Sequence, residues 1–198
     1  MLKHFLQRCE FRLAAAVRVV EGHVHLGVAH VAGTLGLVMA SCRRSSVLCV
    51  GRSNSVTKRP IFEFISPDIH PNDACMVFPF EDDYSFGILQ SEIHWIWFVA
   101  KCSTLKSDFR YTSDTVFDTF PWPQKPSPEH VIRVAAASYN FRAVRRKLMS
   151  KANLSLRKLY RLVELPGENP LKTAQADLDF AVREAYGPYR CFLYKAFP

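Results

Sequence analysis

Few residues of this 198-residue chain stand in a pattern that could support acid–base chemistry. His94 lies beside Trp95 and could act as a general base. Nucleophilic catalysis would also need an activated Ser or Cys, and neither sits in a recognisable elbow motif. A single histidine in a mostly apolar segment is usually a packing residue with a hydrogen bond, and we expect His94 to be one.

Three adjacent acids, Glu81, Asp82 and Asp83, are the second candidate for chemistry, because clustered carboxylates bind divalent cations. The nuclease pattern of an Asp followed by Glu-x-Lys is absent, and adjacent acids in a turn are usually solvated. The six cysteines form no Cys-x-x-Cys pair and have no His at ligand spacing. The sequence therefore predicts no catalytic residue and no metal site, and it indicates buried thiols in a reducing cytoplasm.

The net charge of +8 is divided unevenly along the chain. Residues 1–61 carry +7, residues 62–129 carry −7, residues 130–163 carry +9 and residues 164–198 carry −1, which together give +8. The third segment has nine Lys or Arg and no Asp or Glu, which a solvated face of mixed charges does not explain. Duplex DNA fits this segment, because each phosphate contact releases condensed counterions. Pairing of the arginines with the acidic 62–129 segment is the alternative.

The elements that must position these cations are mainly helices. A Pro-Ser-Pro turn predicts a helix from Glu129 to Met149, with a buried stripe at three- and four-residue steps formed by Ile132, Ala136, Tyr139 and Ala143. Arg142, Arg145 and Arg146 would then share another face. Asn153 or Ser155 can cap a short helix with Leu156, Leu159 and Tyr160 inward. Asn169 can cap a last helix that ends at Gly187. Its apolar residues at helical spacing are expected to face inward: Leu171, Ala174, Leu178, Ala181, Val182 and Ala185.

The middle of the chain alternates between apolar and polar residues in short runs. Residues 60–65 and 75–80 are expected to be strands, and residues 86–100 a single buried helix ending near Lys101. The fold class is therefore predicted to be α+β, with a short-stranded module followed by a helical C-terminal unit. The predicted divisions are an unassigned segment 1–46, a short-stranded region 47–125 and a helical domain 126–198.

Residues 1–46 give the least consistent pattern. Residues 22–42 contain no charged side chain, which meets the length of a membrane span, but three histidines and four glycines lower their hydrophobicity. We expect this segment to be non-native, arising from a truncated or frame-shifted gene, and to be dispensable for folding. A genuine helical extension and a membrane anchor at residues 22–42 are the alternatives.

One stretch, Arg110-Tyr-Thr-Ser-Asp-Thr-Val-Phe-Asp-Thr-Phe-Pro-Trp-Pro123, pairs a basic-aromatic step with an expected strand and a rigid stop. This stretch resembles the C-terminal part of large DNA adenine methyltransferases, including the MmeI-like restriction-modification enzymes. Three further stretches, at residues 56–65, 83–95 and 156–187, resemble the same family in the same order. The resemblance spans roughly residues 47 to 188 and leaves residues 1–46 outside.

The resemblance implies that this chain is the target-recognition portion of an S-adenosylmethionine-dependent DNA adenine-N6 methyltransferase. Residues 47–125 would then be the DNA target-recognition region, a short-stranded recognition module. The glycine-bearing loop for that cofactor and the Asn/Asp-Pro-Pro-aromatic loop for the flipped base are both missing. We therefore expect no cofactor in this chain, no catalysis by it alone, and duplex DNA as its partner, with a separately encoded methyltransferase domain as a second partner. A stand-alone DNA-binding or partner-binding protein, and a small membrane-associated protein, remain alternatives.

Phosphate contacts and base contacts are expected on different residues, because phosphates position a protein and base edges specify the sequence. The basic helix should supply the backbone contacts, and the residues flanking strands should supply base or groove contacts. The expected backbone contacts are Arg142, Arg145, Arg146, Lys147 and Lys151. The expected base or groove contacts are Lys58, Arg59, Arg110 and Tyr111.

Overall fold

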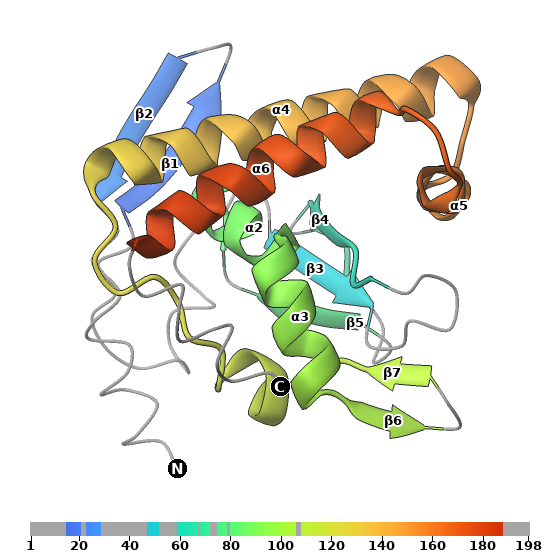
Figure 1. Cartoon of the computed structure of the whole chain (residues 1–198), viewed down its shortest axis with the longest axis horizontal. Coiled ribbons are helices and arrows are strands. Elements are labelled where there is room, and N and C mark those ends of the chain that lie inside the picture. Colours follow the sequence, from blue (N-terminus) through green and yellow to red (C-terminus); the bar gives the residue numbers. More distant parts are fainter. Residues whose placement is uncertain are drawn as a thin grey trace.

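A computed structural model describes residues 15–20, 23–28, 47–51, 59–66, 68–71, 75–78, 80–105 and 108–187. In the described residues, strands β1 to β5 come first, helices α2 and α3 follow, and the strand pair β6–β7 precedes the last helices α4, α5 and α6 (Figure 1). This arrangement confirms the predicted α+β class. Lys58, one of the expected base contacts, lies outside the described residues.

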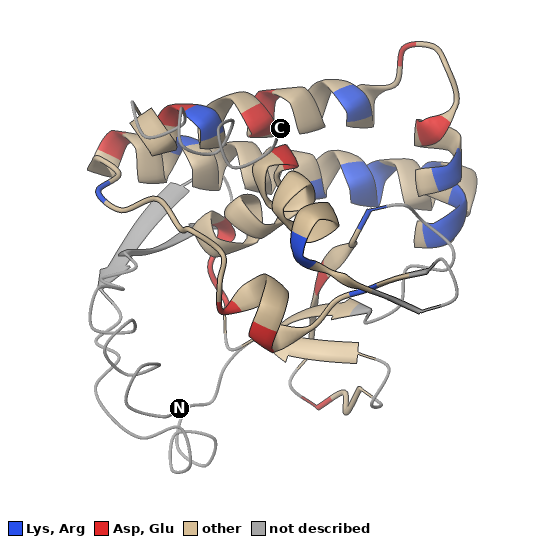
Figure 2. Cartoon of the chain, turned by 60° about the horizontal axis from the view of Figure 1, so that its bottom comes forward, with Lys and Arg blue, Asp and Glu red and all other residues tan. Residues whose placement is uncertain are grey.

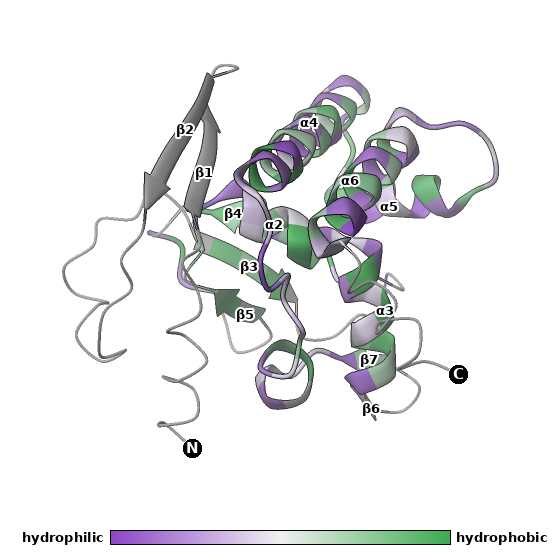
Figure 3. Ribbon diagram, turned by 60° about the vertical axis from the view of Figure 1, so that its left-hand side comes forward, coloured by the Kyte–Doolittle hydropathy of each residue, from purple (hydrophilic) through white to green (hydrophobic). Residues whose placement is uncertain are grey.

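The central sheet has three antiparallel strands in the order β4-β3-β5. β3 (Val47–Gly51) pairs with β4 (Phe62–Ile65) on one side and β5 (Cys75–Phe78) on the other. Leu48 stands opposite both Phe64 and Phe78, and this face carries the core side chains. β3 is coloured as a hydrophobic strand in Figure 3. The two strands expected from apolar alternation are confirmed, with β5 ending two residues earlier than predicted.

Two further strand pairs flank this sheet. β1 (Ala15–Val20) and β2 (His23–Val28) form an antiparallel hairpin, and β6 (Ser103–Leu105) pairs with β7 (Asp108–Arg110). β1 contacts both α2 and α4, as Figure 1 also shows. The alternative of a helical extension is therefore wrong for the hairpin residues, which are strands that pack on the helices. None of the helices in the described part of the chain combines the length and apolarity of a membrane span.

The apolar segment predicted as one helix is two helices separated at Ser91. α2 (Asp83–Gln90) ends there and α3 (Glu92–Lys101) begins, and the Ser91 hydroxyl accepts from the backbone amide of His94 as the N-cap of α3. The predicted end at Lys101 is confirmed. The break was missed because apolar residues continue on both sides of Ser91, whereas the cap depends on one hydroxyl.

Two of the three acids at the start of α2, Asp82 and Asp83, are buried, contrary to expectation. Asp82 is buried and its carboxylate accepts from the backbone amide of Ser85 at 2.7 Å, which caps the helix N-terminus. Burial raises the pKa of Asp82, while the hydrogen bonds from Ser85 oppose this rise. Asp83 is also buried, and only Glu81 of the three acids is exposed. These carboxylates serve the structure of α2.

The helical C-terminal unit follows the predicted caps closely. α4 (Pro128–Ala152) begins after the N-cap Ser127, α5 (Leu156–Glu164) after Ser155, and α6 (Pro170–Tyr186) after Asn169. Gly187 ends α6 at a positive φ of 56°. The expected inward side chains of α6 are all buried: Leu171, Ala174, Leu178, Ala181, Val182 and Ala185.

The predicted buried stripe of α4 is wrong. Ala136, Tyr139 and Ala143 are exposed, and the stripe lies about one residue away around the helix. Its members are Val131, Val134, Ala135, Ser138, Phe141 and Arg145. The prediction from apolar spacing failed because a serine and an arginine occupy core positions. The buried face of α4 is therefore less apolar in sequence than the adjacent face that was predicted.

α4 packs against both α6 and α2, which ties the helical unit to the sheet region. The closest approach is at Gly87, where an added Cβ would collide with the Ser138 hydroxyl and lie 2.9 Å from Val134 Cγ1. Ser138 satisfies its own hydroxyl by donating to the Val134 carbonyl at 2.7 Å. A glycine in α2 is therefore required by the packing of α2 on α4.

Candidate nucleic-acid interface

Exposed cations gather where α4 runs into α5. Figure 2 shows Lys and Arg concentrated at this end of the helical unit. We call this group the basic end, and its exposed members are Arg146, Lys147, Lys151, Arg157, Lys158 and Arg161. The segment 130–163 contains no acidic residue that could neutralise these cations locally. The expected backbone contacts at Arg146, Lys147 and Lys151 are thus placed on one accessible end of the molecule.

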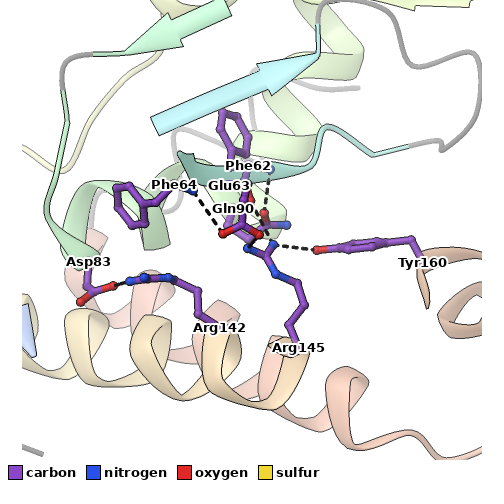
Figure 4. A network of polar contacts seen from close by, with 8 residues as sticks. All are labelled: Phe62, Glu63, Phe64, Asp83, Gln90, Arg142, Arg145 and Tyr160. Atoms are coloured by element: carbon purple, nitrogen blue, oxygen red, sulfur yellow. Dashed lines mark hydrogen bonds and ion pairs between the residues drawn. The ribbon is translucent and has the colours of Figure 1, made fainter. Parts of the chain in front are cut away.

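Arg145, expected at the DNA backbone, is instead buried with 1% of its surface exposed. Its guanidinium donates to the Phe62 carbonyl at 3.0 Å and to the Tyr160 hydroxyl at 3.4 Å. It also donates to the Glu63 carboxylate at 2.6 Å (Figure 4). The expectation that Arg145 reaches outward is wrong, because three internal acceptors hold its guanidinium.

Arg142 is partly buried and forms an ion pair with the buried carboxylate of Asp83 (Figure 4). Its guanidinium also lies over the Phe64 ring, 4.5 Å from the centroid. Burial lowers the pKa of Arg142, and the negative charge of Asp83 opposes this change. The alternative prediction, that the arginines pair with the acidic 62–129 segment, thus describes both Arg142 and Arg145.

These contacts cover the free edge of β4. Gln90 of α2 accepts from the Phe62 amide at 3.3 Å, while Arg145 of α4 donates to the Phe62 carbonyl. The next outward amide, that of Phe64, donates to Glu63 at 3.2 Å. An edge strand with unpaired backbone groups is a template for unwanted pairing. Side chains from α2 and α4 remove that liability and fix the sheet against the helices.

Tyr111, expected at the base edges, is fully buried. Its hydroxyl lies 3.0 Å from Nε2 of His94, and its ring stacks on Phe98 with 5.6 Å between centroids. Desolvation lowers the pKa of His94 to about 3, so the imidazole is neutral at neutral pH. His94 is confirmed as a packing residue with a hydrogen bond, and the expectation that Tyr111 reaches outward is wrong.

The remaining expected groove contacts lie near α3. Arg110 is exposed at the end of β7, and the chain after it forms a short π-helical turn, η2 (Ser113–Phe117), rather than the expected strand. Arg59 is half-buried with its guanidinium 5.6 Å from the centre of the Trp95 ring. Arg110 is therefore accessible, whereas Arg59 has an aromatic partner within the protein.

A cavity of about 420 Å³ lies between the helices beside Arg59. Its walls come from α3 to α6 and include Trp95, Tyr160 and Asp179. The Asp179 carboxylate accepts from the backbone amide of Glu92 at 2.8 Å and from the Gln175 side chain at 3.0 Å. Burial raises the pKa of Asp179 to about 6. Sequence reasoning missed this residue because nothing in its local pattern marks an acid of α6 that caps α3.

No cluster of three or more His, Cys, Asp or Glu side chains in the part of the chain that the structure describes could hold a metal ion. The described fold and its basic end define a recognition module with an attached helical unit.

Residues 21–124 match the family model described as "MmeI, target recognition domain", which is just over half of the chain. The chain belongs to this family of target recognition domains. Because the match begins at residue 21, the expectation that residues 1–46 lie wholly outside the resemblance is wrong. The second strand of the N-terminal hairpin is part of the family's domain.

A solved structure of the Type IIL restriction-modification enzyme MmeI, in complex with DNA, is similar to this chain, with 24% sequence identity and a TM-score of 0.65. The similarity covers 76% of this chain and 21% of the solved one, so the chain spans about a fifth of that protein's length. At this identity the similarity shows the fold alone. The search of curated proteins gives no match.

Proposed function

We propose that this chain is the DNA-recognition portion of an adenine-N6 methyltransferase, belonging to a restriction-modification system and acting in the cytoplasm. The membership of residues 21–124 in the target-recognition family is the observation that carries this proposal. The exposed basic end, on a helical unit attached to that domain, supports it independently. A recognition portion of this kind holds the flanking duplex while a catalytic pocket elsewhere receives the flipped base.

The basic end is proposed to grip the phosphate backbone. Arg146, Lys147 and Lys151 are exposed along the last turns of α4, so their charges can reach phosphates without breaking internal contacts. Arg142 and Arg145 leave the proposed set, because Asp83, Glu63 and the Phe62 carbonyl already hold them. Their role is to fix the angle between the central sheet, β4-β3-β5, and α4, which carries part of the basic end.

Base or groove contacts are proposed for Arg110, and for Lys58 and Arg59 as the basic step before β4. An exposed guanidinium at the end of a two-stranded ribbon can bond both O6 and N7 of guanine in the major groove. Arg59 would need to leave the face of Trp95 to do the same. Arg110 is therefore the stronger candidate of the three.

Methyl transfer and S-adenosylmethionine are proposed to belong to a catalytic domain outside this sequence, which would be the chain's protein partner. The motifs that seat the cofactor and the flipped adenine do not occur in these 198 residues. Isothermal calorimetry of the purified chain with S-adenosylmethionine is expected to show no saturable heat. Tight binding would overturn this division of labour.

Salt dependence of duplex binding tests the proposed grip. Log affinity should fall about linearly with log salt, with a slope of about 0.9 per phosphate contacted. A double variant, R146A and K147A, should flatten the slope by about 2 if both residues touch phosphates. Fluorescence anisotropy of a labelled duplex across a salt series gives the slope.

The matched control removes two exposed cations from the N-terminal end of α4 and the segment just before it. K125A with R133A makes the same change in net charge, and both residues are exposed. Residues 133 and 146 of α4 are about 20 Å apart along the helix at 1.5 Å per residue. This control should leave the slope near its wild-type value. Equal effects of the two double variants would show that net charge alone drives binding and would contradict a localised grip.

A further inference from the structure

Two cysteines lie on the outer face of the central sheet, the face opposite the core. In the β3–β5 register Cys49 stands opposite Val77, and Gly51 stands opposite Cys75. Side chains alternate between the two faces of a strand, so Cys49, Val77 and Cys75 project from the same face. The core side chains Leu48 and Phe78 lie on the other face.

Cys49 and Cys75 are therefore diagonal neighbours across two adjacent strands. Both are free cysteines of intermediate exposure. Val77, which stands opposite Cys49 on the same face, is 45% exposed. A small oxidant can thus reach the pair. Burial raises the pKa of Cys49 to about 11, and the adjacent Cys75 adds to this rise, which is consistent with direct contact.

We propose that Cys49 and Cys75 form an oxidisable dithiol, which a diazene or peroxide oxidant converts into a disulfide that joins β3 to β5. With diamide, one thiolate adds to the N=N bond and the second thiolate attacks the first sulfur. The S–S bond forms as the S–N bond breaks, and the hydrazine product carries away two electrons and two protons. A high thiol pKa makes this reaction slow at neutral pH, because the thiolate is the nucleophile.

The bond can close after a small movement of one strand. Diagonal neighbours in an antiparallel pair have Cα atoms about 7–8 Å apart, whereas disulfides span about 4.4–6.8 Å. β5 must therefore move slightly toward β3. β5 is an edge strand that pairs with β3 alone in this sheet, and Gly51 presents no side chain opposite Cys75. A small shift of β5 thus breaks no pairing on its far side.

Peptide mapping of the oxidised full-length chain tests the proposal. The reduced protein is treated with diamide, blocked with N-ethylmaleimide, digested with trypsin and analysed by mass spectrometry without reduction. Cleavage after Arg44, Arg52, Lys58 and Lys101 gives peptides 45–52 and 59–101, which contain Cys49 and Cys75 as their only cysteines. A linked pair of these peptides, two hydrogens lighter than their sum and separated by dithiothreitol, is the expected product.

Two single variants complete the test. C75S should abolish the linked pair and leave Cys49 blocked by maleimide, whereas C102S should keep it. Cys102 serves as the control because its thiol contacts the Val99 carbonyl of its own helix. Circular dichroism checks that each variant is folded. A folded wild-type chain without the 45–52/59–101 link, or with Cys49 linked as often to Cys102, would overturn the proposal. The test uses no DNA, so its outcome is independent of the proposed function.

Discussion

Arg145 donates a hydrogen bond to the backbone carbonyl of Phe62, 83 residues earlier in the chain, at 3.0 Å. This bond joins β4, at the edge of the central sheet, to α4. The same guanidinium holds Glu63, and the Phe86 ring lies 5.6 Å from its centre. An arginine from the most basic segment of the chain is thus a structural centre between the sheet and the helical unit.

Replacing Arg145 by alanine should lower the free energy of unfolding by about 3 kcal/mol. The Phe62 carbonyl would lose its side-chain donor at a buried position, and Glu63 would lose its partner. Lysine should not rescue the variant, because one ammonium group cannot reproduce the bidentate reach of guanidinium. Urea denaturation followed by circular dichroism gives the free energy of unfolding.

R146A is the matched control for that experiment. The neighbouring arginine is exposed, so its loss should change the unfolding free energy by no more than about 0.5 kcal/mol. DNA binding should show the reverse order of effects. R146A should reduce the slope of log affinity against log salt more than R145A does. Equal stability of R145A and R146A would refute the structural role assigned to Arg145.

Adding one methyl group at Gly87 should destabilise the protein by about 1–3 kcal/mol. The new Cβ would collide with the Ser138 hydroxyl and would stand 2.9 Å from Val134 Cγ1, so α2 and α4 must separate. A second substitution, S138A, removes the colliding oxygen and should recover part of the loss. Thermal unfolding of G87A, S138A and the double variant measures the coupling, and simple additivity of the two changes would contradict this packing account.

Capping signals made the helical unit predictable from sequence. Ser127, Ser155 and Asn169 each accept from a backbone amide of the first helical turn, which is a local interaction that a short stretch of sequence specifies. The apolar spacing of α6 agreed with these caps, so its buried face was predicted correctly. Local and tertiary preferences point the same way in this helix.

The candidate site was harder to predict, because its outcome depends on partners far away in sequence. Arg145 and Arg146 are adjacent and chemically identical, yet one is buried against Glu63 and the other is exposed. Asp83 likewise follows two other acids in the sequence, and nothing local indicates that Arg142, 59 residues later, donates a hydrogen bond to it. Charge patterning identified the basic segment but could not divide it into internal and exposed arginines.

Removing the N-terminal hairpin should destabilise the remainder of the chain. β1 contacts both α2 and α4, so deletion of residues 1–28 uncovers the parts of these helices that face β1. This outcome is the opposite of the dispensability expected from sequence. Deletion of residues 1–14, which precede β1, is the control. The urea midpoints of the two deletions should differ, and an unchanged midpoint for the longer deletion would restore the original expectation.

Replacing Tyr111 by phenylalanine should reduce stability without changing DNA affinity. The variant loses the hydroxyl that lies 3.0 Å from His94 Nε2, at a cost of about 1 kcal/mol, because the imidazole is left without that partner in the core. DNA binding should stay within twofold of wild type at each salt concentration, since the ring is fully buried. A selective loss of affinity with unchanged stability would restore Tyr111 to the set of base contacts.

Asp179 should make stability fall as the pH rises through mildly acidic values. Its folded pKa is raised by burial to about 6, compared with an ordinary value of 3.8 for an aspartate. Between these two values the folded state holds a proton that the unfolded state has released, so raising the pH favours unfolding. The neighbouring charges are Glu92, which adds to the rise, and Arg59, which opposes it.

Substitution of Asp179 by asparagine isolates this effect. The amide oxygen can still accept from the Glu92 backbone amide, but the side chain no longer ionises. The measured quantity is the unfolding free energy of the wild type minus that of D179N. It should fall between about pH 4 and 6, by at most about 3 kcal/mol, and stay constant at higher pH. Urea denaturation at half-unit pH steps measures this difference, with D177N, at an exposed aspartate of the same helix, as the control. A difference that stays constant with pH would show that Asp179 is ionised throughout and that its hydrogen bonds outweigh its burial.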